Sequence, residues 1–193
     1  MELTVDPKVR GLIFDLDGTL VDSMPLHYEA WREVCEKIGF DFTSEFFYAH
    51  AGMSSDKIFT EIKEIINGDF DPDAFSDEKE KIYESKIHKL TLIEPVFRIV
   101  KDYHHKLPMS IGTGSPSGHS WKAMKAMGLD QYFDIVIGKE VVSKPKPDPE
   151  TFLKCAEAMS VEPESCQVFE DGDFGLQAAR NAGMIATDIR LYI

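Results

Sequence analysis

The sequence lacks the features that mark several classes of protein. Its 193 residues include only three cysteines, which are scattered along the chain. Their spacing lacks a Cys-x-x-Cys pair, which argues against a zinc site and against a disulfide framework. No cluster of lysine and arginine is present and the formal net charge is −13, which argues against nucleic acid or an anionic membrane as a partner. No apolar run is long enough to cross a bilayer, and no apolar signal region precedes the first strand. We therefore expect a soluble, cytoplasmic protein whose cysteines are reduced and buried.

The hydrophobic pattern changes character twice along the chain. Residues 9–14 predict a buried strand, whereas residues 25–89 show apolar positions at helical spacing and no clear strand. After about residue 95, predicted strands alternate with predicted helices, which is typical of a doubly wound parallel sheet with ligands at the carboxyl ends of its strands. We therefore predict an α/β fold with a Rossmann-like core of residues 1–22 and 90–193 and a helical cap of residues 23–89 inserted into it.

The most informative stretch is residues 11–23, where an apolar strand leads directly into the carboxylates of Asp15 and Asp17. Side chains alternate along a strand, so the two would share a face if the strand continued, but Gly18 allows the backbone to turn sharply. The carboxylates can then converge from different directions. One could then hold a metal ion while the other donates and accepts protons. The alternative interpretation is an Asp-rich turn that has no catalytic role.

A second strand end with acidic residues lies near the C-terminus. An apolar strand precedes Glu170 and Asp171, and a glycine turn then leads into a predicted helix, which Asp173 is expected to cap. Mg²⁺ prefers a shell of oxygen ligands and usually keeps several waters. Asp15, the backbone carbonyl of Asp17 and Asp171 would suffice as protein ligands, with Glu170 as a further ligand or a neighbour of one.

Two loops carry residues suited to a phosphate group. A strand runs into Thr113 and Gly114, which offer a hydroxyl and uncovered backbone N–H groups, although the same sequence also fits a turn before a helix, with Ser115 as the cap. In residues 143–148, two prolines hold the chain extended, so that the ammonium of Lys144 is aimed rather than free. A solvated lysine in a stiff loop is the alternative there.

Taken in order, these four segments resemble the motifs of the haloacid dehalogenase superfamily of phosphotransferases, and in particular the subfamily of β-phosphoglucomutase. The resemblance is carried by residues 14–23, 112–115, 144–148 and 170–183. It extends over almost the whole chain, and a cap inserted directly after the first motif is also typical of the subfamily. It implies that Asp15 is a nucleophile toward phosphorus and that Asp17 is a general acid and base.

The resemblance assigns roles to other residues as well. It implies that Thr113 and Gly114 bind the transferring phosphate. Lys144, and not Lys146, is expected to neutralise the charge between nucleophile and phosphate. His27, in the first cap helix, is expected to help position the general acid. A carboxylate can attack phosphorus to form an aspartyl phosphate if a cation screens the two anions, so Mg²⁺ is expected as the cofactor.

The expected function is hydrolysis of a small phosphomonoester. The expected binding partner is therefore a small phosphorylated metabolite. The C-terminal motif and residues 188–191 are similar to small bacterial phosphatases of fructose 1-phosphate and related sugar phosphates. An isomerase of the β-phosphoglucomutase type is one alternative, but residues 51–56 lack the arginine that the mutase pattern carries near Ser55, with Lys57 and Lys79 as possible substitutes. A non-catalytic sugar-phosphate sensor is the other, although a pure binder would not need Asp17 as a proton donor.

Overall fold

The computed structural model describes residues 2–50, 53 and 55–193. Its strands alternate with helices along the chain and form one parallel sheet. The chain divides into two compact units. The first, here called the core unit, comprises the residues up to Asp22 together with Thr91–Ile193, and the second, the cap unit, comprises Ser23–Leu90. Each unit is described by itself below.

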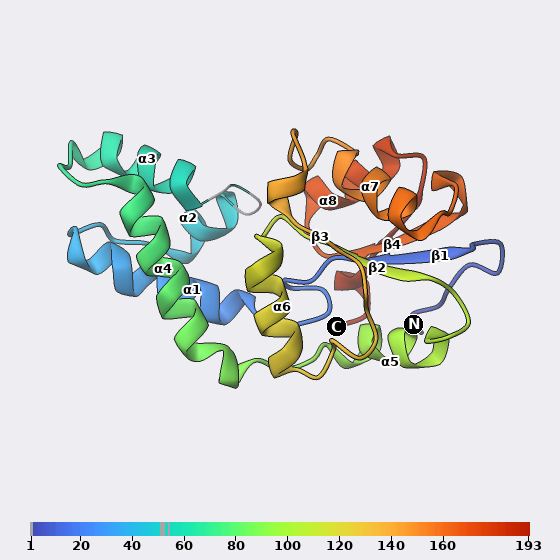
Figure 1. Cartoon of the computed structure of the whole chain (residues 1–193). Coiled ribbons are helices and arrows are strands. Elements are labelled where there is room, and N and C mark those ends of the chain that lie inside the picture. The colour runs from blue at the N-terminus through green and yellow to red at the C-terminus, as the bar shows by residue number, and fades with distance from the viewer. Residues whose placement is uncertain (1, 51–52, 54) are drawn as a thin grey trace. The chain divides into compact units, whose positions relative to one another are not determined.

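The core unit is a doubly wound α/β fold (Figure 1). Its elements are β1 (Gly11–Phe14), α5 (Glu94–Tyr103), β2 (Met109–Gly112), α6 (Ser117–Ala126), β3 (Val136–Ile137), α7 (Glu150–Met159), β4 (Cys166–Glu170), α8 (Asp173–Asn181) and β5 (Ile185–Asp188). The five strands are parallel in the order β3-β2-β1-β4-β5. Helices α7 and α8 lie on one face, and α5 and α6 on the other (Figure 1). The predicted fold class is therefore confirmed.

The strand order reverses at β1, which fixes where a ligand site can form. The chain builds β2 and β3 on one side of β1, and then β4 and β5 on its other side. In doubly wound sheets, ligands bind at the carboxyl ends of the strands beside such a reversal. The carboxyl ends of β1 and β4, which carry the two acidic segments, lie at this point.

Apolar packing on both faces holds β1 and β4 in register. Ile13 pairs with Val168, and both belong to a buried cluster that includes the side chains of α7 and α8. Phe14 pairs with Phe169, and their rings stack at 5.0 Å between centroids. The backbone N–H of Asp15 donates to the carbonyl of Phe169 at 3.0 Å, so this register continues to the first acidic residue.

Strand β5 was not predicted, because its sequence carries little strand signal. Thr187 and Asp188 are polar and no residue of β5 is fully buried, in contrast to the buried run of β1. As the edge strand next to β4 it is mostly half-buried, so its residues need not be uniformly apolar.

The cap unit is built from helices around an aromatic core. Its helices are α1 (Met24–Lys37), α2 (Ser44–Ala49), α3 (Ser55–Ile66) and α4 (Pro72–Lys86). Trp31 of α1 stacks on Phe42 at 5.0 Å and packs against Phe59 at 4.7 Å. No strand occurs among the described residues of this unit.

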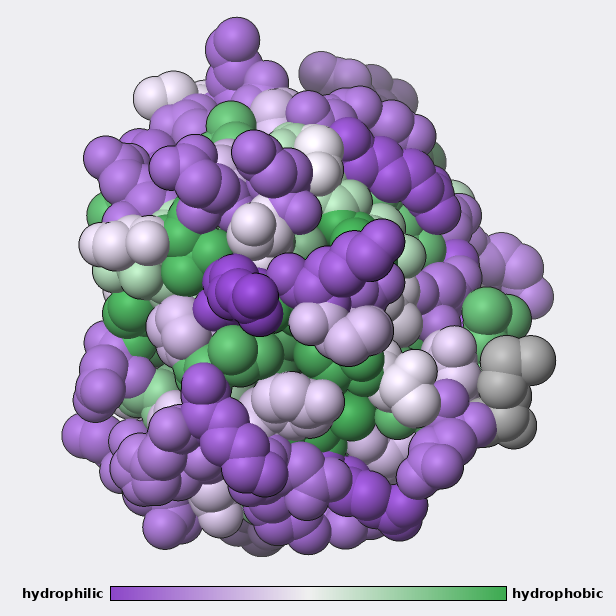
Figure 2. Space-filling model, turned by 90° about the vertical axis from the view of Figure 1, so that its right-hand side faces the viewer, coloured by the Kyte–Doolittle hydropathy of each residue, from purple (hydrophilic) through white to green (hydrophobic). Residues whose placement is uncertain are grey.

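The surface in view is mostly hydrophilic. On the face shown in Figure 2, hydrophilic residues cover most of the surface and hydrophobic residues are visible in smaller areas between them. None of the helices in the described part of the chain is long and apolar enough to cross a membrane.

Candidate active site

Asp15 is placed at the carboxyl end of β1, where the buried strand ends. The residue is only 6% exposed. The turn that follows depends on Gly18, whose φ of +82° is rarely adopted by residues with a side chain. A Cβ atom at Gly18 would also overlap with the carboxylate of Asp171. Glycine at this position therefore allows the loop after β1 to approach the loop after β4.

Three carboxylates from these two strand ends form a cluster. Asp15, Glu170 and Asp171 each present a ligand atom, and these atoms all lie within 4.8 Å of one another. The hydroxyl of Thr19 donates to Asp171 at 2.7 Å and fixes its orientation. Three carboxylates are the hard oxygen donors that Mg²⁺ and similar cations prefer, so the described residues fit a divalent metal ion.

Burial disfavours negative charge in the cluster and raises the pKa of two of its carboxyl groups, those of Asp171 and Asp15. Burial raises the pKa of Asp171 to about 6, the hydrogen bond from Thr19 opposes this, and the charge of Glu170 adds to it. Burial likewise holds the pKa of Asp15 well above its ordinary value, with Glu170 and Asp171 adding to the effect and a lysine opposing it. A cation at this place would favour the ionised carboxylates.

That lysine is Lys146. Its ammonium lies 2.7 Å from Asp15 Oδ1 and 2.8 Å from Glu170 Oε1, and 4.6 Å from the centre of the Phe152 ring. Burial alone would lower the pKa of Lys146, but the two carboxylates outweigh it and raise the pKa above its ordinary value. Lys146 therefore carries a fixed positive charge between Asp15 and Glu170.

The structure corrects the prediction that Lys144 occupies this place. The side chain of Lys144 is 74% exposed, and its ammonium lies 3.9 Å from Asp148 at the surface. The Lys-Pro-x-Pro pattern occurs twice in overlapping registers, from Lys144 and from Lys146, and local sequence does not distinguish them. The second register ends directly before α7, whose buried Phe152 contacts the lysine, and this spacing is the signal that identifies Lys146.

The loop after β2 brings Thr113 and Gly114 to the same edge of the sheet. The backbone N–H of Thr113 donates to the carbonyl of Ile137 at 3.0 Å, and its hydroxyl accepts from the N–H of Ser115 at 3.0 Å. No heavy atom lies within 4 Å of where a Cβ of Gly114 would be, so open space adjoins the backbone there. Whether Thr113 and Gly114 bind phosphate stays a prediction.

Two neighbouring predictions about helix caps were wrong. Ser115 does not cap α6, which follows Pro116 without a side-chain cap; its hydroxyl instead donates to Asp17 Oδ2 at 2.9 Å. Asp173 does not cap α8 either, because it is the first residue of the helix and accepts from Arg190 at 2.8 Å. Both side chains have partners distant in the sequence, which local cap rules do not identify.

His27 lies in α1, and its described contacts are inside the cap unit. Its ring stacks on Tyr83 at 3.9 Å, and its Nδ1 lies 3.0 Å from the ammonium of the buried Lys79. Its predicted role beside the general acid stays a prediction. The expectation about a missing cap arginine falls partly on Ala51, Gly52 and Ser54, which lie outside the described residues.

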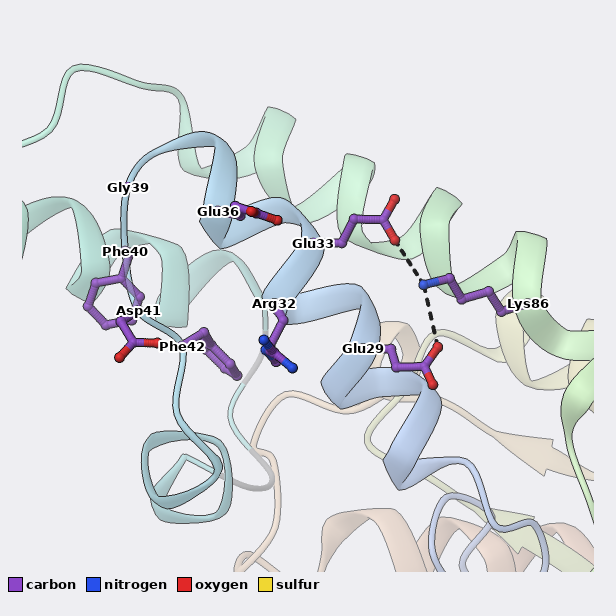
Figure 3. Close-up of a pocket in the computed structure, with 9 residues that line it drawn as sticks. All are labelled: Glu29, Arg32, Glu33, Glu36, Gly39, Phe40, Asp41, Phe42 and Lys86. Carbon is purple, nitrogen blue, oxygen red and sulfur yellow. Dashed lines mark hydrogen bonds and ion pairs between the residues drawn. The ribbon is translucent and has the colours of Figure 1, made fainter.

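A pocket of about 480 Å³ lies within the cap unit (Figure 3). It is lined by Glu29, Arg32, Glu33, Glu36, Gly39, Phe40, Asp41, Phe42 and Lys86. The ammonium of Lys86 reaches Glu33 at 2.8 Å and Glu29 at 3.6 Å, as the dashed lines show. None of the predicted site residues lines this pocket. Asp15, Glu170 and Asp171 instead lie together at the acidic edge of the sheet, which is therefore the candidate active site.

Two glycines in helices provide a matched test of this acidic edge. A Cβ at Gly175 would overlap with the carboxylate of Glu170, whereas nothing lies within 4 Å of a Cβ at Gly118. Gly175→Ala should displace Glu170 and lower both divalent-cation affinity and activity. Gly118→Ala should raise the free energy of unfolding by about 0.5–1 kcal/mol and leave activity unchanged. Calorimetric cation binding and thermal unfolding would measure both effects, and unaltered cation affinity in Gly175→Ala would contradict a role for Glu170.

Comparison with known proteins agrees with this geometry. The family described as haloacid dehalogenase-like hydrolase matches residues 12–188. The chain is 42% identical to the fructose-1-phosphate phosphatase YqaB of Escherichia coli, over 95% of this chain and 98% of that protein. It is 28% identical to a phosphorylated carbohydrates phosphatase of Thermotoga maritima, over 91% and 82% of the two chains. The crystal structure of a β-phosphoglucomutase from Clostridium difficile superimposes with a TM-score of 0.83 at 25% identity, over 93% and 84%.

Proposed function

Because the chain belongs to the haloacid dehalogenase-like hydrolase family and is an enzyme of its phosphatase group, we propose that it hydrolyses a small sugar phosphate with Mg²⁺ as cofactor. The observation that carries the proposal is the buried Asp15 carboxylate, which contacts the ammonium of Lys146 and belongs to one cluster with Glu170 and Asp171. This arrangement combines a nucleophile, a fixed positive charge and a set of oxygen ligands for a cation at one strand end.

The chemistry proceeds in two displacements at phosphorus. Asp15 attacks the phosphorus, a bond forms between its carboxylate oxygen and phosphorus, and the bond from phosphorus to the sugar oxygen breaks. Asp17 gives a proton to the departing sugar oxygen. A water molecule then attacks the phosphorus of the aspartyl phosphate and gives its proton to Asp17. Inorganic phosphate leaves and the Asp15 carboxylate is regenerated.

The other residues of the edge neutralise and hold the phosphate group. Lys146 supplies positive charge beside the attacking carboxylate, and Thr113 and Gly114 offer a hydroxyl and backbone N–H groups to the phosphate oxygens. Asp15, Asp171 and the backbone carbonyl of Asp17 would hold Mg²⁺, with Glu170 beside them. When bound, the ion screens the repulsion between the nucleophile and the phosphate.

Fructose 1-phosphate is the substrate that we propose first. The name of the Escherichia coli relative supports it, and the Thermotoga maritima relative supports phosphorylated carbohydrates as the wider class. Similarity to β-phosphoglucomutases keeps an isomerase as the second candidate. The absence of arginine from residues 51–56 favours the hydrolase, since reorienting a bisphosphate intermediate requires a firm hold on its second phosphate.

The test is phosphate release from fructose 1-phosphate, β-glucose 1-phosphate and glucose 6-phosphate, with Mg²⁺ or with a chelator. We expect Mg²⁺-dependent release, fastest from fructose 1-phosphate, that the chelator abolishes and added Mg²⁺ restores. Release that is insensitive to the chelator would contradict the metal assignment. Isomer formation without phosphate release, dependent on a bisphosphate primer, would establish the second candidate in place of the first.

A further inference from the structure

We propose that Ser115 is a positioning residue for Asp17, an inference that rests on the proposed function. The Ser115 hydroxyl lies 2.9 Å from Asp17 Oδ2, although the two residues are 98 positions apart in the sequence. The contact joins the loop after β1 to the loop after β2, which are neighbouring strands of the sheet. It therefore links the proposed acid and base directly to the loop that is proposed to hold the phosphate.

The backbone around Ser115 is fixed by hydrogen bonds within its own loop and to the segment that follows β3. Its N–H donates to the Thr113 hydroxyl at 3.0 Å, and its carbonyl accepts from the N–H of Lys139 at 3.1 Å. Two residues further on, the N–H of Ser117 donates to Glu140 at 3.1 Å. With the backbone held on both sides, the side-chain torsions of Ser115 are its remaining freedom, and its hydroxyl is directed at Asp17.

Close packing supports the same backbone position. A Cβ at Gly138 would lie 2.9 Å from the Ser115 carbonyl and 2.5 Å from the N–H nitrogen of Ser117. The loop after β3 thus approaches the loop after β2 as closely as a glycine permits. Three consecutive strand ends are thereby coupled, from Gly138 through Ser115 to Asp17.

A hydroxyl suits this position because it can donate a hydrogen bond to a carboxyl oxygen in either protonation state of the acid. It donates to Oδ2 of Asp17 when Asp17 is a carboxylate, and also when the other carboxyl oxygen carries the proton for the leaving group. The contact can therefore persist through both displacements and hold the carboxyl group at one distance from the phosphate. Misplacement of a reacting group by about 1 Å can cost on the order of 100-fold in rate, so loss of this contact should have a measurable effect on proton transfer.

The test compares two leaving groups, because only one of them needs a proton. Fructose 1-phosphate releases an alkoxide that must be protonated, whereas p-nitrophenyl phosphate releases a stabilised phenolate. The measured quantity is kcat/KM, which includes phosphoryl transfer to Asp15 but not hydrolysis of the aspartyl phosphate. Ser115→Ala should lower kcat/KM for fructose 1-phosphate by about 10–100-fold. For p-nitrophenyl phosphate the expected change is below about 3-fold, and Ser115→Thr, which keeps the hydroxyl, should restore the sugar-phosphate rate.

The Asp17→Asn variant, alone and combined with Ser115→Ala, distinguishes failure of this inference from failure of the proposed function. Ser115→Ala should have no further effect in Asp17→Asn, because the hydroxyl acts through the carboxyl group. An equal fall for both substrates in Ser115→Ala, or fully additive effects in the double variant, would overturn the inference. If Asp17→Asn loses activity and Ser115→Ala does not, the inference alone fails. If Asp17→Asn keeps the wild-type rate on fructose 1-phosphate, the acid and base assignment of the proposed function fails together with it.

Discussion

Asp15→Asn is expected to lower phosphate release by about 10⁴-fold or more, the range found when a nucleophile is removed from an enzyme. The asparagine amide has nearly the same volume as the carboxylate but does not attack phosphorus. The loss should appear on every phosphomonoester that the wild type hydrolyses, whatever its leaving group. Initial rates on freshly purified protein, with mass spectrometry to detect deamidation back to aspartate, measure the effect.

The same variant should fold at least as well as the wild type. Burial, together with the charges of Glu170 and Asp171, outweighs the ammonium of Lys146 and raises the pKa of Asp15, so its negative charge is unfavourable in the folded protein. Removing that charge should leave the unfolding temperature unchanged or higher. Asp102→Asn, at an exposed position of α5, is the matched control and should retain full activity. Full activity in verified, undeamidated Asp15→Asn would exclude Asp15 as the nucleophile.

Lys146→Met should have the second large effect, on both stability and activity. Methionine keeps most of the apolar contact with Phe152 but leaves two buried carboxylates, Asp15 and Glu170, without their shared ammonium. Removal of one partner from a buried ion pair costs about 3 kcal/mol. Loss of a fixed charge beside the reacting groups should lower kcat by about 100-fold or more. Chemical denaturation without added metal and initial rates at saturating substrate measure the two effects.

Lys144→Met is the matched control two residues away. Its ammonium is exposed and lies 3.9 Å from Asp148, a separation at which surface ion pairs contribute little. We expect a change below about 0.5 kcal/mol in the free energy of unfolding and less than about 2-fold in activity. A large effect of Lys144→Met together with a small effect of Lys146→Met would restore the interpretation made from the sequence.

The fold was predictable because its signals are local. One buried run leads into Asp15 and a similar one ends at Glu170, and helical segments separate the strands along the chain. Such alternation predicts a parallel sheet, in which the carboxyl ends of the strands meet at one edge. The acidic cluster follows from this topology without knowledge of side-chain contacts. Strand β5 was missed because a half-buried edge strand with polar residues lacks the uniform apolar pattern of the central strands.

The remaining errors concern side chains whose partners are distant in the sequence. Lys144 and Lys146 stand in the same proline pattern, and burial against α7 separates them only in the folded chain. Ser115 and Asp173 satisfy the local rules for helix caps, but each is bound to a residue of another loop or strand end, Asp17 and Arg190 respectively. Sequence patterns identify the type of residue at a site, whereas the choice between neighbouring candidates depends on tertiary packing.

The most direct test of the proposed mechanism is to detect phosphate on Asp15. The enzyme would be mixed with fructose 1-phosphate and Mg²⁺, quenched in acid within milliseconds, and digested for mass spectrometry. We predict a phosphorylated peptide that contains Asp15, that decays when the substrate is consumed, and that is absent from Asp15→Asn. Rapid phosphate release with no phosphorylated Asp15 at any time point, or phosphate on a different residue, would contradict the account.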